Sequence, residues 1–515
     1  MIRPDHQVAI ISAGLGGLGA AIALKRAGIE DFVVLERASD IGGTWRDNTY
    51  PGIAVDIPAQ AYQFSYELKP DWSRVFATGA EVKAYIDHCA DRYDVRRHLR
   101  LESEVVVREW DEGAHLWRLR LPAGSEITAR FVISAVGAFV NPKPVEIEGV
   151  EDFQGTVLRS AAWDHSVSLE GKRAAIVGTG ASAVQIVPEI ARELARLDVY
   201  QRTPIWVGPK VDFRTSAAAK LLFSRYPQAQ DAVRRVLTSV VEAGLVGGVV
   251  NYESSAWLTR GAAWMARNIW YRQVRDPAVR RRLIPDYDVG CKRPSVSNSY
   301  LRTFNQPNVE LVSERIERVF DRGIRTIDGR EREVDVLVLA TGFRLATDPE
   351  NYRLNPVRGR DGFDLARFYA EHRARSYESV SLPGLPNHFM IFGPYGWTGG
   401  TWHVLVETAS HHIIRIIEEA GRRGATAVEV REEAAERWTR FAVERLGRSL
   451  WSLGSCATAN SYYFDHHGDT PFLRPTSSRE AWHAARSFPL DDYEFRAPHE
   501  HPTASRREPV EETAV

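Results

Sequence analysis

The chain has 515 residues, of which 44% are hydrophobic and 26% are charged, and its formal net charge is −1. A chain of this length is expected to form two or three domains. The near-zero net charge provides no electrostatic footprint for nucleic acid or for an acidic membrane. We therefore expect neither of these as a partner, and we take a monomer as the default state.

The three cysteines, Cys89, Cys291 and Cys456, are widely spaced, and none of them forms a CxxC pair. This pattern argues for a reducing compartment and against both a metal site and a redox-active disulfide. No signal-peptide pattern precedes the first strand. The apolar run 237–252 is too short and too interrupted to span a bilayer. We therefore expect a cytoplasmic enzyme.

The first elements in the chain form a dinucleotide-binding unit. A buried parallel strand is expected over 7–12, followed by a glycine-rich turn and an amphipathic helix. Gly14 and Gly17 allow a pyrophosphate to approach the helix N-terminus, where free N–H groups favour anions. The next strand, 32–35, ends at Glu36, which is placed to hold a ribose 2′-OH. The unit is thus expected to bind the ADP half of FAD.

A second unit of the same kind begins with a strand over 174–177. Superposing the two units places Arg202 where the first unit has Glu36. An acid there accepts from a free ribose hydroxyl, whereas a cation suits a 2′-phosphate. The second unit is therefore expected to bind NADPH rather than NADH. The residues expected to wrap its pyrophosphate are Thr179, Gly180, Ala181, Ser182, Ala183, Val184 and Gln185.

These units predict an α/β fold with two Rossmann-like dinucleotide-binding domains, one for FAD and one for NADPH, and a helical insertion. The FAD domain is expected over 1–145 and again over 346–496, and the NADPH domain over 146–345. An Arg-rich helical insertion over about 212–288 is a candidate wall or lid for a substrate pocket, with a purely structural role as the alternative. The tail 497–515 is expected to be disordered.

Four further motifs carry a resemblance that covers about 1–495. They are Gly43-x-Trp45-x4-Tyr50-Pro51-Gly52-x3-Asp56, Phe153-x-Gly155-x3-Arg159-x3-Trp163-Asp164, Gly290-Cys291-Lys292-Arg293-Pro294 and Ala340-Thr341-Gly342-Phe343. In these motifs the chain resembles the Baeyer–Villiger monooxygenases, flavoproteins that insert one oxygen atom of O2 beside a ketone carbonyl. The resemblance implies FAD and NADPH as cofactors, and O2 and a small apolar ketone as substrates. The product would be an ester or a lactone, formed through a C4a-peroxyflavin.

The resemblance also implies roles for particular residues. Arg293 would stabilise the negative charge that develops on oxygen, because a guanidinium stays charged when it is partly desolvated. Asp56 would pair with Arg293 and orient it. The remaining contacts expected with the cofactors are Lys292, Arg202 and Thr203 at the 2′-phosphate, Thr44, Trp45 and Tyr62 at the flavin, and Tyr462 on the nicotinamide side.

Two positions depart from the expected patterns. Ser12 stands where the first nucleotide fingerprint has glycine, so its backbone either finds an allowed conformation or is strained. Arg159 stands where the family has a histidine at the linker between the domains. In the aromatic loop 393–403, His403 is not expected to be catalytic, because a lone histidine at a helix start is more often a cap or a core residue.

Two alternatives to the ketone oxygenase stay open. One is an N- or S-oxygenating flavin monooxygenase. The other is an uncoupled or non-oxygenating flavoprotein, for which Ser12 and Arg159 are the support. A disulfide reductase shares the architecture of two nucleotide units, but the lack of a CxxC pair nearly excludes it.

Overall fold

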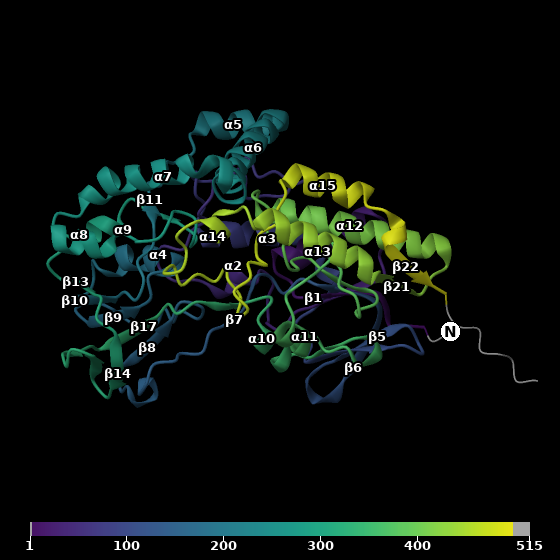
Figure 1. The fold of residues 1–515 in the computed structure, drawn as a ribbon, viewed down its shortest axis with the longest axis horizontal. Coiled ribbons are helices and arrows are strands. Elements are labelled where there is room, and N and C mark those ends of the chain that lie inside the picture. Colours follow the sequence, from purple (N-terminus) through teal and green to yellow (C-terminus); the bar gives the residue numbers. More distant parts are fainter. Residues whose placement is uncertain (1–2, 498–515) are drawn as a thin grey trace, which may run out of the picture.

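The computed structural model describes residues 3–497. The chain folds around two separate β-sheets, one at each end of the molecule, with a group of helices along the edge that lies uppermost in Figure 1. Apart from residue 497, the tail expected to be disordered lies outside the described residues.

The first sheet has eight strands and holds the expected N-terminal nucleotide unit. Its centre is β1, which pairs in parallel with β2 and β6. The chain returns to this sheet late, because β20 also pairs with β6. The strands are β1 (His6–Ile11), β2 (Phe32–Leu35), β3 (Leu99–Arg100), β4 (Val107–Asp111), β5 (Leu116–Arg120), β6 (Glu126–Ser134), β19 (Val357–Arg358) and β20 (His388–Met390).

Two helices on this side of the molecule pack against each other at short range. They are α1 (Leu15–Arg26) and α12 (Trp402–Arg423). The contact is possible because Gly19 has no side chain, since a Cβ there would overlap a methyl group of Val406. The C-terminal part of the chain is thereby fixed to the first nucleotide unit. The other helices on this side of the molecule are α2 (Thr44–Asp47), α3 (Gly79–Arg92), α10 (Pro349–Leu354), α11 (Leu365–Glu371), α13 (Glu432–Leu446), α14 (Leu450–Leu453) and α15 (Ser478–Ser487).

The second sheet has five strands, all parallel, in the order β13-β10-β9-β17-β8. Its central strands are apolar and buried on both faces, as expected for a parallel sheet. The strands are β8 (Thr156–Arg159), β9 (Arg173–Val177), β10 (Arg196–Tyr200), β13 (Val309–Val312) and β17 (Val336–Leu339), and α4 (Ala181–Ile190) follows β9. Smaller sheets contain β11 (Val207–Gly208), β12 (Ser295–Val296), β14 (Ile316–Phe320), β15 (Gly323–Thr326), β16 (Glu331–Glu333), β21 (Ala427–Val430) and β22 (Tyr493–Arg496).

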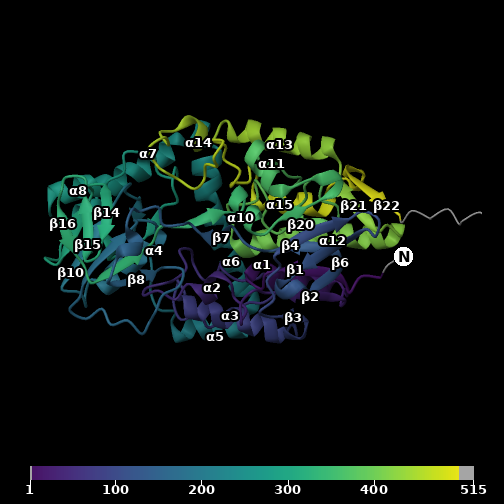
Figure 2. The ribbon, with the colours of Figure 1, turned by 90° about the horizontal axis from the view of Figure 1, so that it is seen from below.

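The chain crosses between the two sheets twice, and the crossings pair with each other. The outward crossing contains β7 (Phe139–Pro142), and the return crossing contains β18 (Phe343–Leu345). The two strands form an antiparallel ladder in which Phe343 lies opposite Pro142. The sheets are therefore joined by a two-stranded ribbon rather than by two independent linkers (Figure 2).

The Arg-rich insertion is helical, as expected. It contains α5 (Ala217–Arg225), α6 (Pro227–Glu242), a π-helical segment Ala243–Val250, α7 (Tyr252–Asn268) and α8 (Pro277–Leu283). The prediction of an α/β fold with two Rossmann-like units and a helical insertion is confirmed. The exact domain bounds stay a prediction. Within 3–497, no helix is long and apolar enough to cross a membrane.

Candidate functional site

The first glycine-rich turn is organised around Glu36, which is 2% exposed. Its carboxylate accepts hydrogen bonds from the backbone N–H groups of Ala13 at 2.7 Å and Ala38 at 3.1 Å. Arg46 donates a third, at 3.1 Å. Gly17 has to be glycine, because a Cβ there would overlap the carbonyl oxygen of Ser12. The turn thus brings Gly14, the helix N-terminus and the acid together, as a ribose and a pyrophosphate require.

Ser12 occupies the glycine position of this turn with a φ of 84°. This conformation is left-handed, and in it a side chain costs about 1–3 kcal/mol. The hydroxyl of Ser12 recovers little of this, because it lies 3.4 Å from the Glu36 carboxylate. Of the two outcomes expected for Ser12, the structure therefore shows the strained one.

We predict that Ser12→Gly stabilises the protein by about 1 kcal/mol, because relief of the strained φ exceeds the added entropy of the unfolded chain. Urea unfolding of the two proteins measures the difference. Ala13→Gly is the matched control, because Ala13 has no positive φ. Ala13→Gly is expected to lower the free energy of unfolding. If both substitutions lowered the free energy of unfolding equally, the inference that Ser12 is strained would be contradicted.

The segment from Gly43 to Asp56 lies between the two nucleotide units. The hydroxyl of Tyr50 donates to Gln185 at 3.1 Å, and the Gln185 amide donates to the carbonyl oxygen of Ala54 at 2.9 Å. Gly52 has a φ of 82°, and a Cβ there would lie 2.7 Å from the carbonyl oxygen of Gln185. The motif therefore fits directly against helix α4 of the second unit, which explains its Pro-Gly turn.

Asp56, at the end of this segment, forms an ion pair with Arg293 at 2.6 Å. The guanidinium also lies 5.7 Å from the ring centre of Trp397 and bonds the hydroxyl of Tyr462. Desolvation alone would lower the pKa of Arg293. Asp56 and the hydroxyls of Tyr462 and Tyr463 outweigh desolvation and hold this pKa above its usual range. The site thus contains a permanent cation with a fixed carboxylate partner.

An aromatic cluster lies next to this ion pair. Trp45 donates its indole N–H to the hydroxyl of Tyr62 at 3.1 Å, and the ring of Tyr62 meets the edge of His403 at 4.7 Å. Burial raises the pKa of Tyr62. Burial also lowers the pKa of His403 to about 3, and neither of its ring nitrogens has a hydrogen-bond partner among the described residues. His403 is therefore a neutral, buried histidine. Thr44, which begins helix α2, stands directly before Trp45.

The second turn has the geometry of a phosphate cradle. Gly178 has a φ of 120°, and a Cβ there would overlap the carbonyl oxygen of Ala340 in the Ala-Thr-Gly motif. Gly180 caps helix α4, with open space where its Cβ would lie. The hydroxyl of Thr179 donates to the carbonyl oxygen of Thr203 at 2.7 Å. The residues Ala181 to Gln185 form the first turns of that helix.

Two cations, Arg202 and Lys292, lie close together beside this turn. Burial, followed by the charge of Arg202, lowers the pKa of Lys292 to about 8. Asn460 accepts from the Arg202 Nε at 3.1 Å when its amide is turned to satisfy both groups. Within residues 3–497, neither cation has an acidic side chain as an ion-pair partner. A 2′-phosphate would supply the missing negative charge.

We predict that NADPH binds more weakly as the pH rises through about 8. In the folded protein without NADPH, Lys292 loses its proton around pH 8 rather than around the ordinary lysine pKa of 10.5. Above pH 8, binding of the phosphate therefore requires uptake of a proton by Lys292. The Kd for NADPH is expected to be about tenfold higher at pH 9 than at pH 7. Calorimetry in buffers of different ionisation enthalpy measures both the affinity and the proton uptake.

Two controls test the assignment of this pH dependence to Lys292. Lys292→Met should bind NADPH weakly at every pH and show no proton uptake. NADH, which lacks the 2′-phosphate, should bind wild-type protein without this pH dependence. A slope that survives in Lys292→Met would contradict the assignment.

Cys291 and Cys456 form a disulfide between segments 165 residues apart. A reducing compartment was expected from the sequence, and this bond was not predicted. The spacing of the cysteines in the sequence could not predict this bond, because the segments 284–293 and 449–463 come together only in the folded chain. Trp451 donates to the carbonyl oxygen of Gly290 at 3.0 Å, and Thr458 donates to Asp286 at 3.0 Å. Cys89 is a free, buried thiol. No group of residues suited to a metal ion exists within 3–497.

Arg159 lies at the end of β8 and is exposed. Its side chain has no ion pair with any described residue, and so none with Asp56, which pairs with Arg293. The neighbouring motif residues do reach the first unit, because His165 shares a hydrogen bond with Thr49 at 3.0 Å. Trp163 is partly buried and packs against the main core.

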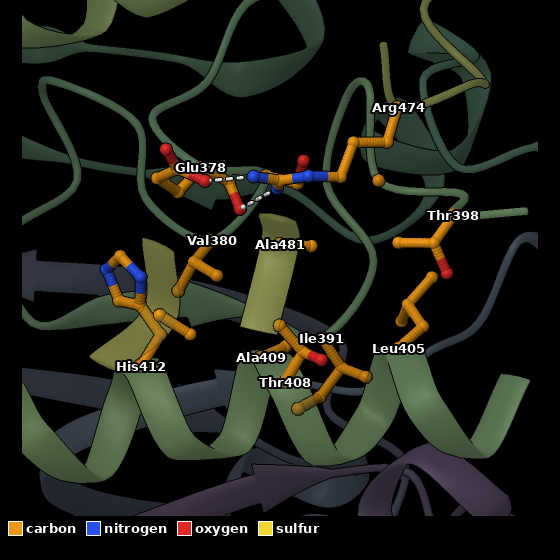
Figure 3. A pocket seen from close by; sticks show the side chains of 13 residues that line it. Glu378, Val380, Ile391, Thr398, Leu405, Thr408, Ala409, His412, Arg474 and Ala481 are labelled. Carbon is orange, nitrogen blue, oxygen red and sulfur yellow. Dashed lines mark hydrogen bonds and ion pairs between the residues drawn. The ribbon is translucent and has the colours of Figure 1, made fainter. Parts of the chain in front are cut away.

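A small cavity of about 20 Å³ is lined in part by Gly396 and Thr398 of the aromatic loop. It lies between helices α12 and α15 and contains the buried Glu378–Arg474 ion pair (Figure 3). A cavity of this size holds about one water molecule. It is therefore part of the packing rather than a substrate pocket.

Sequence reasoning missed several residues that build this site. Arg46 holds Glu36, Tyr463 supports Arg293, and Asn460 reaches Arg202. Tyr50 belongs to the Gly43–Asp56 motif, which indicated that the residue is important but did not predict its contact with Gln185. The only sequence feature that pointed to Asn460 as a site residue was its position two residues before Tyr462.

Known proteins share this arrangement. Residues 9–220 match the family described as pyridine nucleotide-disulphide oxidoreductase. A Baeyer–Villiger monooxygenase of Pseudomonas aeruginosa is 37% identical over 87% of this chain and 84% of its own length. One from Streptomyces coelicolor is 36% identical over 96% and 94%. The crystal structure of OTEMO in complex with FAD and NADP has a TM-score of 0.84 at 28% identity, and the match covers 96% of this chain and 100% of that one.

The expected family is thus confirmed over nearly the whole chain. The residues present also fit the two cofactors of such enzymes. The first turn offers a buried acid and a glycine helix start, and the second offers two unpaired cations. The chain belongs to the Baeyer–Villiger monooxygenase family and is an NADPH-dependent flavin monooxygenase.

Proposed function

We propose that this enzyme inserts one oxygen atom of O2 next to the carbonyl group of a small apolar ketone, which gives an ester or a lactone. The observation that carries the proposal is the ion pair between Asp56 and Arg293, placed where the Gly43–Asp56 segment meets the second nucleotide unit. FAD, when bound and reduced by NADPH, supplies the activation of O2.

Arg293 supplies positive charge next to the reacting oxygen atoms. Addition to a ketone carbonyl places negative charge on oxygen, and a fixed cation stabilises that charge more in the transition state than in the ground state. Arg293 suits this role because its raised pKa keeps it protonated throughout the working pH range. Asp56 and Tyr462 hold the guanidinium in position.

The surroundings of Arg293 support an apolar substrate. Trp45, Tyr62 and Trp397 place aromatic surface around the cation. The helical insertion closes this region, because a Cβ on Gly399 would lie 2.9 Å from a methyl group of Val246. These contacts support the role of the insertion as a wall of the site.

The remaining expected residues have roles in binding. We infer that Glu36 binds the ribose of FAD, that Thr179–Gln185 bind the pyrophosphate of NADPH, and that Arg202 and Lys292 bind its 2′-phosphate. Tyr462 meets the ring of Phe139 in the crossing ribbon at 5.2 Å and faces the nicotinamide side. We take the enzyme as a monomer.

The experiment that tests the proposal offers the FAD-loaded enzyme a matched pair of substrates, cyclohexanone and cyclohexylamine, together with NADPH and isotopically labelled O2. Mass spectrometry should find one labelled oxygen atom in a lactone and none in the amine. An oxygenated amine without lactone would establish the N-oxygenating alternative. NADPH oxidation that yields only hydrogen peroxide with a wide panel of ketones would establish the uncoupled one.

A further inference from the structure

Exposed apolar side chains are concentrated in the helical insertion. Among the described residues, thirteen of the nineteen large hydrophobic side chains that are exposed fall within 211–269. A soluble helix ordinarily presents polar residues to water and apolar ones to the core. Large exposed apolar patches mark sites of interaction. We call the outer surface of helices α5, α6 and α7 the insertion face.

Helix α7 shows the pattern most clearly. Trp257 is 70% exposed and Trp264 is 62% exposed, and these residues are two helical turns apart on one side. Met265 continues the same side at 56% exposure. The opposite side packs inward through Tyr252 and Ala263, which are buried. The packing of α7 on the protein is thus satisfied without the tryptophans.

Helices α5 and α6 repeat the pattern. In α6, Val236 and Val240 are 62% and 63% exposed, while Gln230, on another side of the helix, is buried and bonds the loop at Lys69. In α5, Leu221 is 69% exposed. The three helices follow one another in the chain and lie along the edge that is uppermost in Figure 1.

The insertion face is basic as well as apolar. Residues 217–268 contain six lysines and arginines but only three acidic residues, whereas the whole chain has a net charge of −1. The acidic residues are already engaged. Asp231 pairs with Arg234 and Arg235, and Glu242 bonds the backbone N–H of Ser478. Among the described residues of this segment, Arg225, Arg260 and Arg267 are exposed and have no ion pair, although Arg260 bonds the hydroxyl of Tyr252 and Arg267 donates to the carbonyl oxygen of Pro285.

We propose that the insertion face docks the enzyme on the surface of an anionic phospholipid bilayer. Amphipathic helices with tryptophan on the apolar side and arginine beside it lie in the plane of the lipid interface. Tryptophan favours the headgroup level, and arginine is attracted to anionic lipid headgroups. A second copy of the chain fits less well, because it would bring two positively charged surfaces together.

The docking orients the enzyme. The π-helical segment that joins α6 to α7 carries Val246, which packs on the Gly399 loop beside the site. A lipid-bound insertion face therefore lies on the outer side of the wall whose inner side faces the aromatic loop. An apolar molecule dissolved in the bilayer would be concentrated next to this wall.

Vesicle flotation of the FAD-loaded enzyme tests the proposal. We expect it to float with vesicles of phosphatidylglycerol and phosphatidylcholine, and to stay behind with phosphatidylcholine alone or in high salt. The double variant Trp257→Ser/Trp264→Ser should lose at least tenfold in vesicle binding. Trp482→Ser is the matched control, because Trp482 is an exposed tryptophan at 38% on α15, outside the insertion. It should bind like wild type.

Two further measurements complete the test. The double variant should oxidise NADPH like wild type without vesicles, since neither tryptophan contacts the site, and this shows that it is folded. Arg225→Glu/Arg260→Glu should abolish the preference for anionic lipid. The proposal is overturned if wild type does not float, or if Trp482→Ser weakens flotation as much as the double variant. It is also overturned if sedimentation velocity finds a dimer that the double variant dissociates, because the insertion face is then a contact between copies.

Discussion

Replacing Arg293 by alanine is expected to lower ester or lactone formation by about two to three orders of magnitude. The reason is that the variant lacks the cation next to the reacting oxygen atoms, and Tyr462 and Asp56 cannot replace its charge. The cofactor contacts of Glu36 and Arg202 lie elsewhere, so FAD content and NADPH oxidation should persist. Electrons from NADPH then leave as hydrogen peroxide. Measuring ester, NADPH and peroxide in one assay gives the coupling directly.

Two variants sharpen this result. Arg293→Lys keeps a positive charge but loses the planar guanidinium, whose several N–H donors reach both Asp56 and Tyr462. It should therefore recover only part of the coupling of NADPH oxidation to ester formation. Arg281→Ala, at an exposed position in α8, is the matched control and should leave coupling unchanged. If Arg293→Ala still formed ester in proportion to the NADPH consumed, the role of this residue in oxygenation would be refuted.

Loss of the Cys291–Cys456 disulfide is expected to lower the free energy of unfolding by about 2–4 kcal/mol. The bond closes a loop of 165 residues, so it removes much of the conformational freedom of the unfolded chain. The effect should reach the site as well. Cys291 directly precedes Lys292 and Arg293, and the segment of Cys456 carries Asn460, so Cys456→Ser should also raise the KM for NADPH.

Urea unfolding with and without reductant measures the first effect. Cys291→Ser and Cys456→Ser should lose equal stability without reductant, and the double variant should lose no more than either. Wild type unfolded in reductant should match them. Cys89→Ser is the control whose effect should not depend on reductant. A peptide map that finds Cys291 and Cys456 as free thiols in the purified protein would contradict the bond.

Much of the fold follows from the sequence because each nucleotide unit is local. A strand, a glycine turn, a helix and the residue after the next strand lie within about thirty positions, so Glu36 and Arg202 can be compared without a structure. Asp56 and Arg293 were paired through motifs rather than through spacing, because residues so far apart in the chain carry no geometric information about each other.

The features that sequence reasoning missed are tertiary. The left-handed φ of Ser12 depends on the close approach of Gly17, and the disulfide depends on two loops that meet only in the fold. The insertion was expected to be helical, but the spacing of Val236 and Val240 is the same whether the apolar side faces the core or the solvent. The segment was recognised as Arg-rich, but the near-zero charge of the whole chain argued against an acidic membrane as a partner.

The paired crossing strands determine how the two halves of the enzyme can move. Two separate, unpaired linkers would allow one half of the enzyme to rotate about either linker. Because β7 and β18 share backbone hydrogen bonds, twisting about one strand breaks the ladder to the other, whereas flexing across the flat side of the ribbon does not. The second nucleotide unit is therefore expected to move relative to the first mainly by bending of this ribbon across its flat side. The ring of Tyr462 contacts Phe139 in this ribbon, and its hydroxyl bonds Arg293. Bending of the ribbon is therefore expected to shift a side chain that holds Arg293.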